Sequence, residues 1–554
     1  MATSGNFVQL HNHTHYSLLD GASKIPDLVK RAKELNMPAV GITDHGNMHG
    51  AYEMWSTAVK EGVKPIIGIE AYVTPETARQ DQTRVSWDTN WNPDIDPQHR
   101  RRNPNDVSGG GLITHLTMWA ETDEGLVNLM KASTDANLEG RVMRYPRMDK
   151  EILAKYSKGI IASSGCPSGI IQTRLLLGQF DEALRAAGEL QDIFGRDNFY
   201  IEFMDHGLKI EKQVTDGLLD IAKKLNAPLL ATNDSHYVRA EDAGSQDAML
   251  CINSGSTLDE PGRFKFDGTG YYLKSAEEMR ELFKDIPEAC DNTLEIAERC
   301  NVMFDDHEDG AFMPQFDCPE GWDETSLFLR KVEEGLEQRY DGHPPIEVLK
   351  QADYECGVIC QMQFCGYFLV VADYINWAKS HGVMVGPGRG SAAGAWWRTH
   401  GHHRTRPIKH GLIFERFLNP ERVSLPDIDV DFDPDGRGRV LDYVGDKYGR
   451  DKVAQCVIYG TIKTKQALKD SARIMGYEFS MGERITKALP PAQTGGKDIP
   501  LRDIFEPTSK RYAEAREFRE LYDSDPDAKR VTDEAMGIEV DSSDRRACVR
   551  HDHG

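Results

Sequence analysis

The strongest constraint on the fold is a regular alternation of short apolar strands with amphipathic helices between Phe7 and about Val238. We expect strands at 39–45, 65–73, 159–165 and 228–236, and helices at 25–35, 179–194 and 210–225. Repeated strand-then-helix units predict an α/β fold built on a parallel sheet or barrel, with functional groups at the C-terminal strand ends. A polar loop at 91–106 interrupts this pattern and is expected to be a surface insertion.

The predicted strand ends carry the side-chain types that bind metals. They are His11, His13, Asp20, His45, Glu70, His115, Cys166, Asp234 and His236. Imidazole, carboxylate and thiolate groups select ions such as zinc, manganese or iron. Nine groups exceed the needs of one ion, so we predict two or three divalent ions, bridged by carboxylates, that would activate water for a phosphodiester displacement. A single cysteine such as Cys166 is more often a small buried apolar residue than a metal ligand. A metal site is favoured because one predicted strand after another ends in a residue type that binds metals.

A second constellation is the strictly alternating stretch S-L-P-D-I-D-V-D-F at 424–432. It places three carboxylates on one strand face, those of Asp427, Asp429 and Asp431. Like charges on one face repel, so we predict magnesium there, bridging the carboxylates and a nucleoside triphosphate. The alternative is a solvated acidic edge strand. Upstream, the loop G-P-G-R-G-S at 386–391 follows a predicted strand and offers backbone N–H groups that could hold phosphates.

The rest of the chain is expected to be mainly helical. A capping box at Ser275 and Glu278 begins a helical stretch at a predicted domain boundary, and 325–382 and 440–535 also have helical patterns. Four basic residues lie on one helical segment: Lys463, Lys465, Lys469 and Arg473. They would contact DNA phosphates or form an ordinary solvated helix face.

Composition excludes some functions and leaves others open. No run of about 18 apolar residues is present, so no membrane span is expected. The N-terminus lacks the pattern of a secretory signal, and the ten cysteines show no C-x-x-C spacing, which predicts a reducing, cytoplasmic setting. The net charge of −23 disfavours a nucleic-acid partner only weakly, because a local basic groove can work within an acidic protein.

Together these motifs resemble those of bacterial DNA polymerase III alpha subunits of the actinobacterial type. The resemblance rests on H-x-H with L-L-D-G, T-D-H-G-N, G-I-E-A-Y, T-H-L, G-C-P-S-G and N-D-x-H, which are typical of the polymerase and histidinol phosphatase (PHP) domain. It also rests on the aspartate stretch, on F-E-R-F-L-N-P-E-R at 414–422 and on Y-G-T-I-K-T-K-Q-A-L-K-D at 459–470. All nine ligand positions of the family are filled, whereas His15 has no counterpart and is expected to contribute only polarity at the rim.

The resemblance implies a distorted, seven-stranded (β/α) PHP barrel at 1–280, an α+β nucleotidyltransferase palm at 281–455 and a helical thumb at 456–539. It implies template-directed DNA synthesis, with DNA primer–template and dNTPs as substrates and a sliding clamp and other replisome subunits as partners. An intact PHP site implies 3′–5′ exonuclease activity, with Asp20 and Asp234 as catalytic residues. In the palm, Asp427 and Asp429 would hold magnesium, and Arg389, Gly390 and Ser391 would bind the triphosphate.

Two segments depart from the family pattern. Residues 395–406 read A-W-W-R-T-H-G-H-H-R-T-R where the family has an apolar helix, and 540–554 also differ. In both, a one-base shift of a permissible coding sequence restores family-like residues, so we interpret both as frameshift products. The third catalytic carboxylate and the clamp-binding region of the family lie beyond this end. We therefore expect a chain that cannot polymerise DNA but keeps its PHP site.

Two other interpretations remain open. The chain could act alone as a PHP phosphoesterase on small substrates, or its metal-bound PHP domain could be structural and without nuclease activity.

Overall fold

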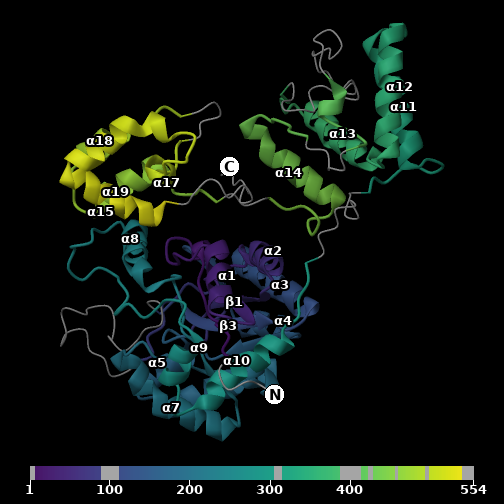
Figure 1. Cartoon of the computed structure of the whole chain (residues 1–554). Helices are drawn as coiled ribbons and strands as arrows, with labels where there is room; N and C mark the ends of the chain where they lie inside the picture. Colours follow the sequence, from purple (N-terminus) through teal and green to yellow (C-terminus); the bar gives the residue numbers. More distant parts are fainter. Residues whose placement is uncertain are drawn as a thin grey trace. The chain divides into compact units, whose positions relative to one another are not determined.

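The computed structural model describes residues 6–88, 111–304, 315–386, 413–421, 428–455, 459–492 and 498–539. The chain forms two compact units (Figure 1). The first comprises Met1–Phe304 with Thr461–Asp544, and the second comprises Asp305–Gly460 with Arg545–Gly554. The loop 91–106, residues 395–406 and the tail 540–554 lie outside the described residues.

The first unit contains an eight-stranded sheet with helices around it. Its strands are β1 (Ala39–Ile42), β2 (Lys64–Val73), β3 (Thr114–Ala120), β4 (Arg141–Val142), β5 (Tyr145–Met148), β6 (Ile160–Ser163), β7 (Phe199–Phe203) and β8 (Leu229–Ala231). Its helices up to Phe304 are α1 (Ile25–Glu34), α2 (Ala51–Glu61), α3 (Asp123–Glu139), α4 (Lys150–Tyr156), α5 (Ile170–Leu176), α6 (Phe180–Phe194), α7 (Lys209–Leu225), α8 (Ala243–Ser254), α9 (Ala276–Leu282) and α10 (Pro287–Arg299). Short 3₁₀ turns are η1 (His15–Ser17), η3 (Arg196–Asn198) and η4 (Ala240–Asp242).

The sheet is mixed, which corrects the prediction of a parallel arrangement. Its order is β4-β5-β2-β3-β6-β7-β8, and β1 also pairs with β2. Strand β3 runs antiparallel to both β2 and β6, whereas β1/β2, β2/β5, β6/β7 and β7/β8 are parallel. A parallel neighbour needs a long crossover, usually a helix. The described parts of the β2–β3 connection, 74–88 and 111–113, contain no helix, so β3 returns alongside β2.

Backbone hydrogen bonds link the N-terminal segment to β1 on one side and to the chain just beyond β8 on the other. Gly41 in β1 donates to the carbonyl of Gln9 at 2.8 Å. On the other side, the His13 amide donates to Ser235, just beyond β8, at 2.7 Å, and the Ser235 amide donates to His11 at 3.1 Å. The segment 9–13 therefore lies between β1 and the continuation of β8. The hydrogen-bonded backbone segments thus close into a ring, which we call the circuit.

The core of this circuit explains why the strands are nearly continuous apolar runs. Every residue of β1, β6 and β7 is buried, as expected for strands covered on both faces. Trp119 is fully buried and donates its indole N–H to the Leu10 carbonyl at 3.1 Å. Ile296 and Ala297 of α10 belong to the same core, so the first unit extends to Phe304. The predicted capping box at Ser275 is confirmed at the start of α9.

The C-terminal helices of the first unit share a core with α8. These helices are α15 (Thr464–Ile474), α16 (Phe479–Lys487), α17 (Leu501–Phe505), α18 (Arg516–Ser524) and α19 (Pro526–Ile538), with η9 (Tyr512–Ala515). Ala248 and Cys251 of α8 are buried in this core. The buried Glu539 carboxylate accepts a hydrogen bond from the Thr464 hydroxyl at 2.6 Å and one from the Leu501 amide at 2.9 Å. This carboxylate joins the two ends of the helical region.

The described part of the second unit is mostly helical. It contains α11 (Glu324–Arg339), α12 (Ile346–Gln361), α13 (Cys365–Ser380), η8 (Phe414–Arg416) and α14 (Pro434–Tyr448). Asp373 of α13 accepts hydrogen bonds from Tyr443, Lys447 and Tyr448, which ties α14 to α13. Within the described ranges no single helix has the length and apolarity to cross a bilayer. Helices α12 and α13 have that length and apolarity only when taken together, and the pair is bent by 115°. Each of the two helices contributes buried residues to the core of this unit.

Candidate metal centre

The carboxylate of Glu70 lies at the centre of a group of four predicted histidine ligands. Its Oε1 atom is 3.1 Å from His115 Nδ1 and 3.6 Å from His11 Nε2. Its Oε2 atom is 2.7 Å from His45 Nδ1 and 3.4 Å from His13 Nε2. Because Glu70 comes from β2 and the histidines come from three other segments, one buried carboxylate faces ligands brought together from across the sheet.

Asp234 extends this group on the side of β8. Its Oδ1 atom is 3.0 Å from His13 Nε2, 3.4 Å from His11 Nε2 and 3.6 Å from His236 Nδ1. Asp234 has a φ of 42°, a left-handed conformation that is uncommon outside glycine. Such conformations persist where the surrounding structure enforces them, and they cluster at functional sites.

Asp20 and Cys166 complete the set at its two edges. Asp20 Oδ2 is 3.2 Å from His45 Nε2, and its Oδ1 is 3.9 Å from His236 Nε2. The Cys166 thiol lies 3.4 Å from His115 Nδ1. The structure therefore brings all nine predicted ligands into one continuous network of contacts.

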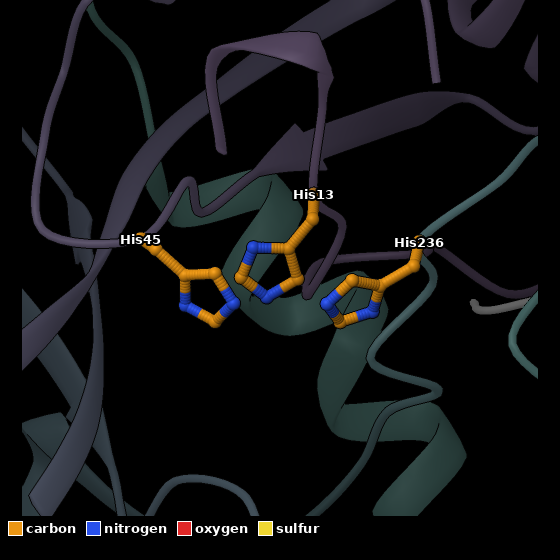
Figure 2. A group of neighbouring side chains, drawn as sticks. All are labelled: His13, His45 and His236. Atoms are coloured by element: carbon orange, nitrogen blue, oxygen red, sulfur yellow. The ribbon is translucent and has the colours of Figure 1, made fainter. Parts of the chain in front are cut away.

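Three overlapping groups of side chains could each hold one ion. They are His13 with His45 and His236, His11 with His13 and Glu70, and His45 with Glu70 and His115, and within each group the ligand atoms lie within 4.8 Å of one another. Figure 2 shows the first group, in which the three imidazole rings lie side by side although each comes from a different segment. The shared members make a multinuclear site possible in geometry and chemistry.

Unsatisfied buried atoms provide an independent test of whether a metal fits. Eight buried side-chain atoms in this cluster make no hydrogen bond: His11 Nε2, His13 Nε2, Asp20 Oδ1, His45 Nδ1, Glu70 Oε1 and Oε2, Asp234 Oδ1 and His236 Nε2. Buried polar atoms are normally hydrogen-bonded, and an unpaired group needs an explanation such as an ion. Divalent ions would satisfy all eight, so the donor set fits the predicted metals.

The local electrostatics ionise the carboxylates but divide the histidines. Against the effect of burial, Glu202 and Asp234 raise the pKa of His11 to about 9, and the pKa of His45 is also raised, so an ion would have to displace protons from these two rings. Burial, together with the positive charges of His45 and His236, lowers the pKa of His13 to about 3, which leaves its imidazole neutral. Burial opposes ionisation of Asp20, yet the neighbouring His45 and His236 hold its pKa at about 2. The same balance keeps the pKa of Glu70 well below its usual value. Neutral imidazoles and ionised carboxylates are the forms that bind metals.

The tight chain path from Thr14 to Gly21 positions Asp20. Leu18 and Leu19 have φ values of 41° and 64°, so two consecutive non-glycine residues are left-handed just before this ligand. A Cβ atom at Gly21 would meet the Thr14 carbonyl at 2.3 Å, so the turn requires glycine there. His15 does not share the strand face of His11 and His13, because the extended segment ends at Thr14 and η1 begins. It lies outside the three groups above.

Glu202 is a member of the site that the sequence did not reveal. It lies in β7, is 2% exposed, and its Oε1 is 2.8 Å from His11 Nδ1. Thr232 donates to the same oxygen at 2.6 Å, and Ser163 donates to the other at 2.5 Å. A carboxylate behind a metal-binding histidine fixes the ring orientation and its tautomer. A single acid in the apolar strand F-Y-I-E-F was the available signal.

The predicted palm site is described only in part. Asp427, Arg389, Gly390 and Ser391 lie outside the described residues. Residues 428–432 form no strand and make one antiparallel bridge, between Phe432 and Val385. The strands expected at 424–432 and just before the glycine-rich loop are therefore not formed in their described parts. The Asp433 amide donates to the Met384 carbonyl at 3.0 Å.

Two features of the expected palm arrangement are nevertheless visible. The Gly386 amide donates to the Asp431 carbonyl at 2.8 Å, so the start of the glycine-rich loop lies beside the aspartate stretch. Ile428 and Val430 pack against the core of the second unit, as their alternation predicts. Asp429 is half-buried and Asp431 is exposed.

The basic residues around α15 are mostly paired with carboxylates. Lys465 contacts Asp498 at 2.9 Å, and Lys469 contacts Glu483 at 2.5 Å. Arg473 lies 4.0 Å from Asp470. These pairs are partly exposed and contribute little to stability, and the DNA-binding role of the basic residues stays a prediction.

Comparison with known proteins agrees with the fold and the cluster. The PHP domain family matches residues 9–206, which include seven of the nine predicted ligands; Asp234 and His236 lie beyond this match. The N-terminal fold and its histidine–carboxylate cluster therefore define a PHP domain with a candidate metal centre. A second family, the bacterial DNA polymerase III alpha NTPase domain, matches residues 326–545.

Relatives that match almost the whole of this chain agree with both domain matches. The chain is 51% identical to a DNA polymerase III subunit alpha from Mycobacterium tuberculosis (strain CDC 1551 / Oshkosh), over 97% of this chain and 45% of the relative. The corresponding values are 51%, 96% and 44% for Saccharopolyspora erythraea and 38%, 97% and 46% for Thermus aquaticus. The chain is therefore a homologue of bacterial DNA polymerase III alpha subunits and spans less than half the length of these relatives.

Proposed function

We propose that this chain is the PHP, palm and thumb portion of a replicative DNA polymerase, and that its PHP domain removes nucleotides from the 3′ end of DNA. The PHP barrel would comprise 1–280, the palm 281–455 and the thumb 456–539. As part of a whole polymerase the chain would act on DNA primer–template and dNTPs, with a sliding clamp and other replisome subunits as partners, whereas by itself we expect it not to polymerise DNA. The observation that supports exonuclease activity most strongly is the group of eight unsatisfied buried atoms that converge on one multinuclear site.

The composition of the cluster suits phosphodiester hydrolysis. Two or three divalent ions bound there would supply an activated water and positive charge opposite the reacting phosphate. Three carboxylates, those of Asp20, Glu70 and Asp234, provide the negative charge that holds several cations close together. Glu70 faces four histidines, while Asp20 lies near two and Asp234 near three, so ions held by these groups would lie close together.

The test is directional digestion by the purified full chain. After metal removal and reloading with Mn²⁺, wild-type protein should shorten a 5′-labelled single strand one nucleotide at a time. Asp20→Asn and Asp234→Asn should each slow this by more than about 100-fold, since even outer partners of metal ligands contribute about 10–100-fold. Asp192→Asn, on the exposed side of α6, is the matched control and should digest at the wild-type rate.

The same assay separates the two alternative roles. Fast turnover of a phosphomonoester beside negligible digestion of DNA would indicate a phosphoesterase for small substrates. Metal binding with no turnover of either substrate, and no effect of the two aspartate variants, would indicate a structural metal centre. Either result would overturn the exonuclease proposal.

For the palm, we propose that Asp427 and Asp429 bind magnesium and that Arg389, Gly390 and Ser391 bind the triphosphate of an incoming nucleotide. In support, the Gly386 amide, at the described start of the glycine-rich loop, donates to the Asp431 carbonyl at 2.8 Å. Equilibrium binding of a fluorescent dNTP should require Mg²⁺ and should be lost in Asp429→Asn. Binding that is unchanged by this substitution would contradict the assignment.

A further inference from the structure

A short hairpin lies at the rim of the metal centre. Strands β4 and β5 are joined by Met143 and Arg144, and Tyr145 begins β5. The Tyr145 ring is 5.0 Å from the ring of Tyr72, and the Tyr72 ring is 6.0 Å from the ring of His45. The hairpin is thus connected to a predicted ligand through one intervening aromatic ring.

Arg144 presents a positive charge at this rim. Its guanidinium lies 5.3 Å from the centre of the Tyr145 ring, and Nη1 donates a hydrogen bond to Asn253 Oδ1 at 2.8 Å. Asn253, on α8, also donates to the Leu19 carbonyl at 3.5 Å, next to the ligand Asp20. Asn253 therefore links Arg144 to the loop that carries Asp20.

The charge of Arg144 is held in place without being neutralised. Among the described residues, its guanidinium forms no ion pair with a carboxylate within 4.0 Å, and the side chain is exposed. An arginine carries five N–H donors, and its contacts with a ring and an amide leave donors available to an anion. The chain has a net charge of −23, so a carboxylate partner for this arginine would be expected, yet none pairs with it in the described residues. An anionic ligand would take the place of such a partner.

We propose that Arg144 binds a phosphate of a DNA strand next to the phosphate being cleaved. This inference rests on the proposed exonuclease function. The rings of Tyr145 and Tyr72 lie between Arg144 and His45 along this line of contacts, and Asn253 links Arg144 to the loop of Asp20, so Arg144 lies beside the predicted ligands and is not one of them. A second phosphate along the strand would meet it. Arg144 thereby favours a polynucleotide over a substrate with a single phosphate.

The test compares DNA with a one-phosphate substrate, bis(p-nitrophenyl) phosphate, using the full chain loaded with Mn²⁺. Arg144→Ala should raise the KM for a single strand about tenfold, as expected for loss of a charge-assisted hydrogen bond. It should leave turnover of the small substrate within about twofold of wild type. Arg144→Lys keeps the charge but lacks the planar guanidinium, so its KM for the single strand should lie between those of wild type and Arg144→Ala. The matched control is Arg141→Ala, on the same hairpin and exposed, which should resemble wild type.

A binding measurement tests the same contact without catalysis. In EDTA, the affinity of a fluorescent single strand should depend less steeply on salt in Arg144→Ala, with the log–log slope reduced by about 0.7, the value for one phosphate contact. Equal loss on both substrates, or DNA binding indistinguishable from Arg141→Ala, would overturn the proposal. If the wild type digests no DNA, the exonuclease function fails, while the binding comparison still decides whether Arg144 contacts phosphate.

Discussion

The Nδ1 atom of His11 lies 2.8 Å from the Oε1 atom of Glu202, which turns His11 Nε2 toward Glu70 and Asp234. Glu202 is buried and also receives hydrogen bonds from Ser163 and Thr232, so its position is fixed on three sides. This arrangement is the familiar one of a carboxylate that supports a metal-binding histidine from behind.

Glu202→Gln should weaken metal binding without unfolding the domain. The amide keeps the shape but cannot support the same charge and tautomer of His11, and outer partners of this kind contribute about 10–100-fold in metal affinity. Competition with a chelator of known affinity, followed by metal analysis of the protein, measures this change. Glu182→Gln, on the exposed surface of α6, is the control. Equal metal retention by both variants would show that Glu202 does not support the site.

Removal of metal should destabilise the first unit. The cluster holds buried carboxylates and unpaired nitrogen atoms that an ion would satisfy, so the folded chain binds metal better than the unfolded chain does. At an ion concentration of 100 times Kd this contributes about 2.7 kcal/mol, and excess EDTA should lower Tm by several degrees. Thermal unfolding with and without Mn²⁺ measures the shift, which should be much smaller in Asp20→Asn than in Asp192→Asn. An EDTA-insensitive Tm for the wild type would contradict a tightly bound metal.

Arg147→Lys should destabilise the connection between β2 and β3. The Arg147 side chain is fully buried and donates to the carbonyl oxygens of Arg79, Asp81, Leu112 and Gly140. Lysine lacks the planar fork that reaches all four, and a buried carbonyl left unpaired costs about 1–3 kcal/mol. Chemical denaturation should show a loss of this size, against no change for the exposed Arg141→Lys. If the denaturation midpoint of Arg147→Lys equals that of wild type, the prediction is wrong, and water would then replace the hydrogen bonds of the guanidinium.

Lys274 should make stability depend on pH above neutrality. Burial lowers the pKa of its amine to about 8, while its Nζ donates to Asn233 Oδ1 at 2.6 Å. Between this value and its ordinary pKa of about 10.5, the unfolded chain holds a proton that the folded chain does not. The free energy of unfolding should therefore rise with pH across this window, by up to about 1.4 kcal/mol per unit, relative to Lys274→Met. If the free energy of unfolding varies with pH in the same way for both proteins, the pKa of the Lys274 amine is not lowered in the folded chain.

Metal binding by the nine side chains stays a prediction, and His115 comes from the start of the antiparallel β3. The sequence nevertheless predicts which side chains gather, because most of them follow parallel strands whose C-terminal ends meet at one edge. His45 after β1 and Glu70 in β2 are examples. The direction of β3 was not predictable, since it depends on how the chain returns after the insertion that follows β2. Glu202 was missed because one acid inside an apolar strand has no spacing to mark it. Arg144 was missed because its role depends on Tyr72 and Asn253, which are distant in sequence.

The central claim is that the nine side chains bind divalent ions and that this metal centre hydrolyses DNA from its 3′ end. The most direct measurement titrates metal-depleted wild-type chain with Mn²⁺ and follows, on the same samples, the ions bound per chain and the 3′–5′ digestion of a 5′-labelled single strand. We predict that digestion appears only as at least two ions bind, and that Asp234→Asn binds fewer ions and does not digest. Undiminished digestion in excess EDTA, or wild-type digestion by Asp234→Asn, would contradict the account.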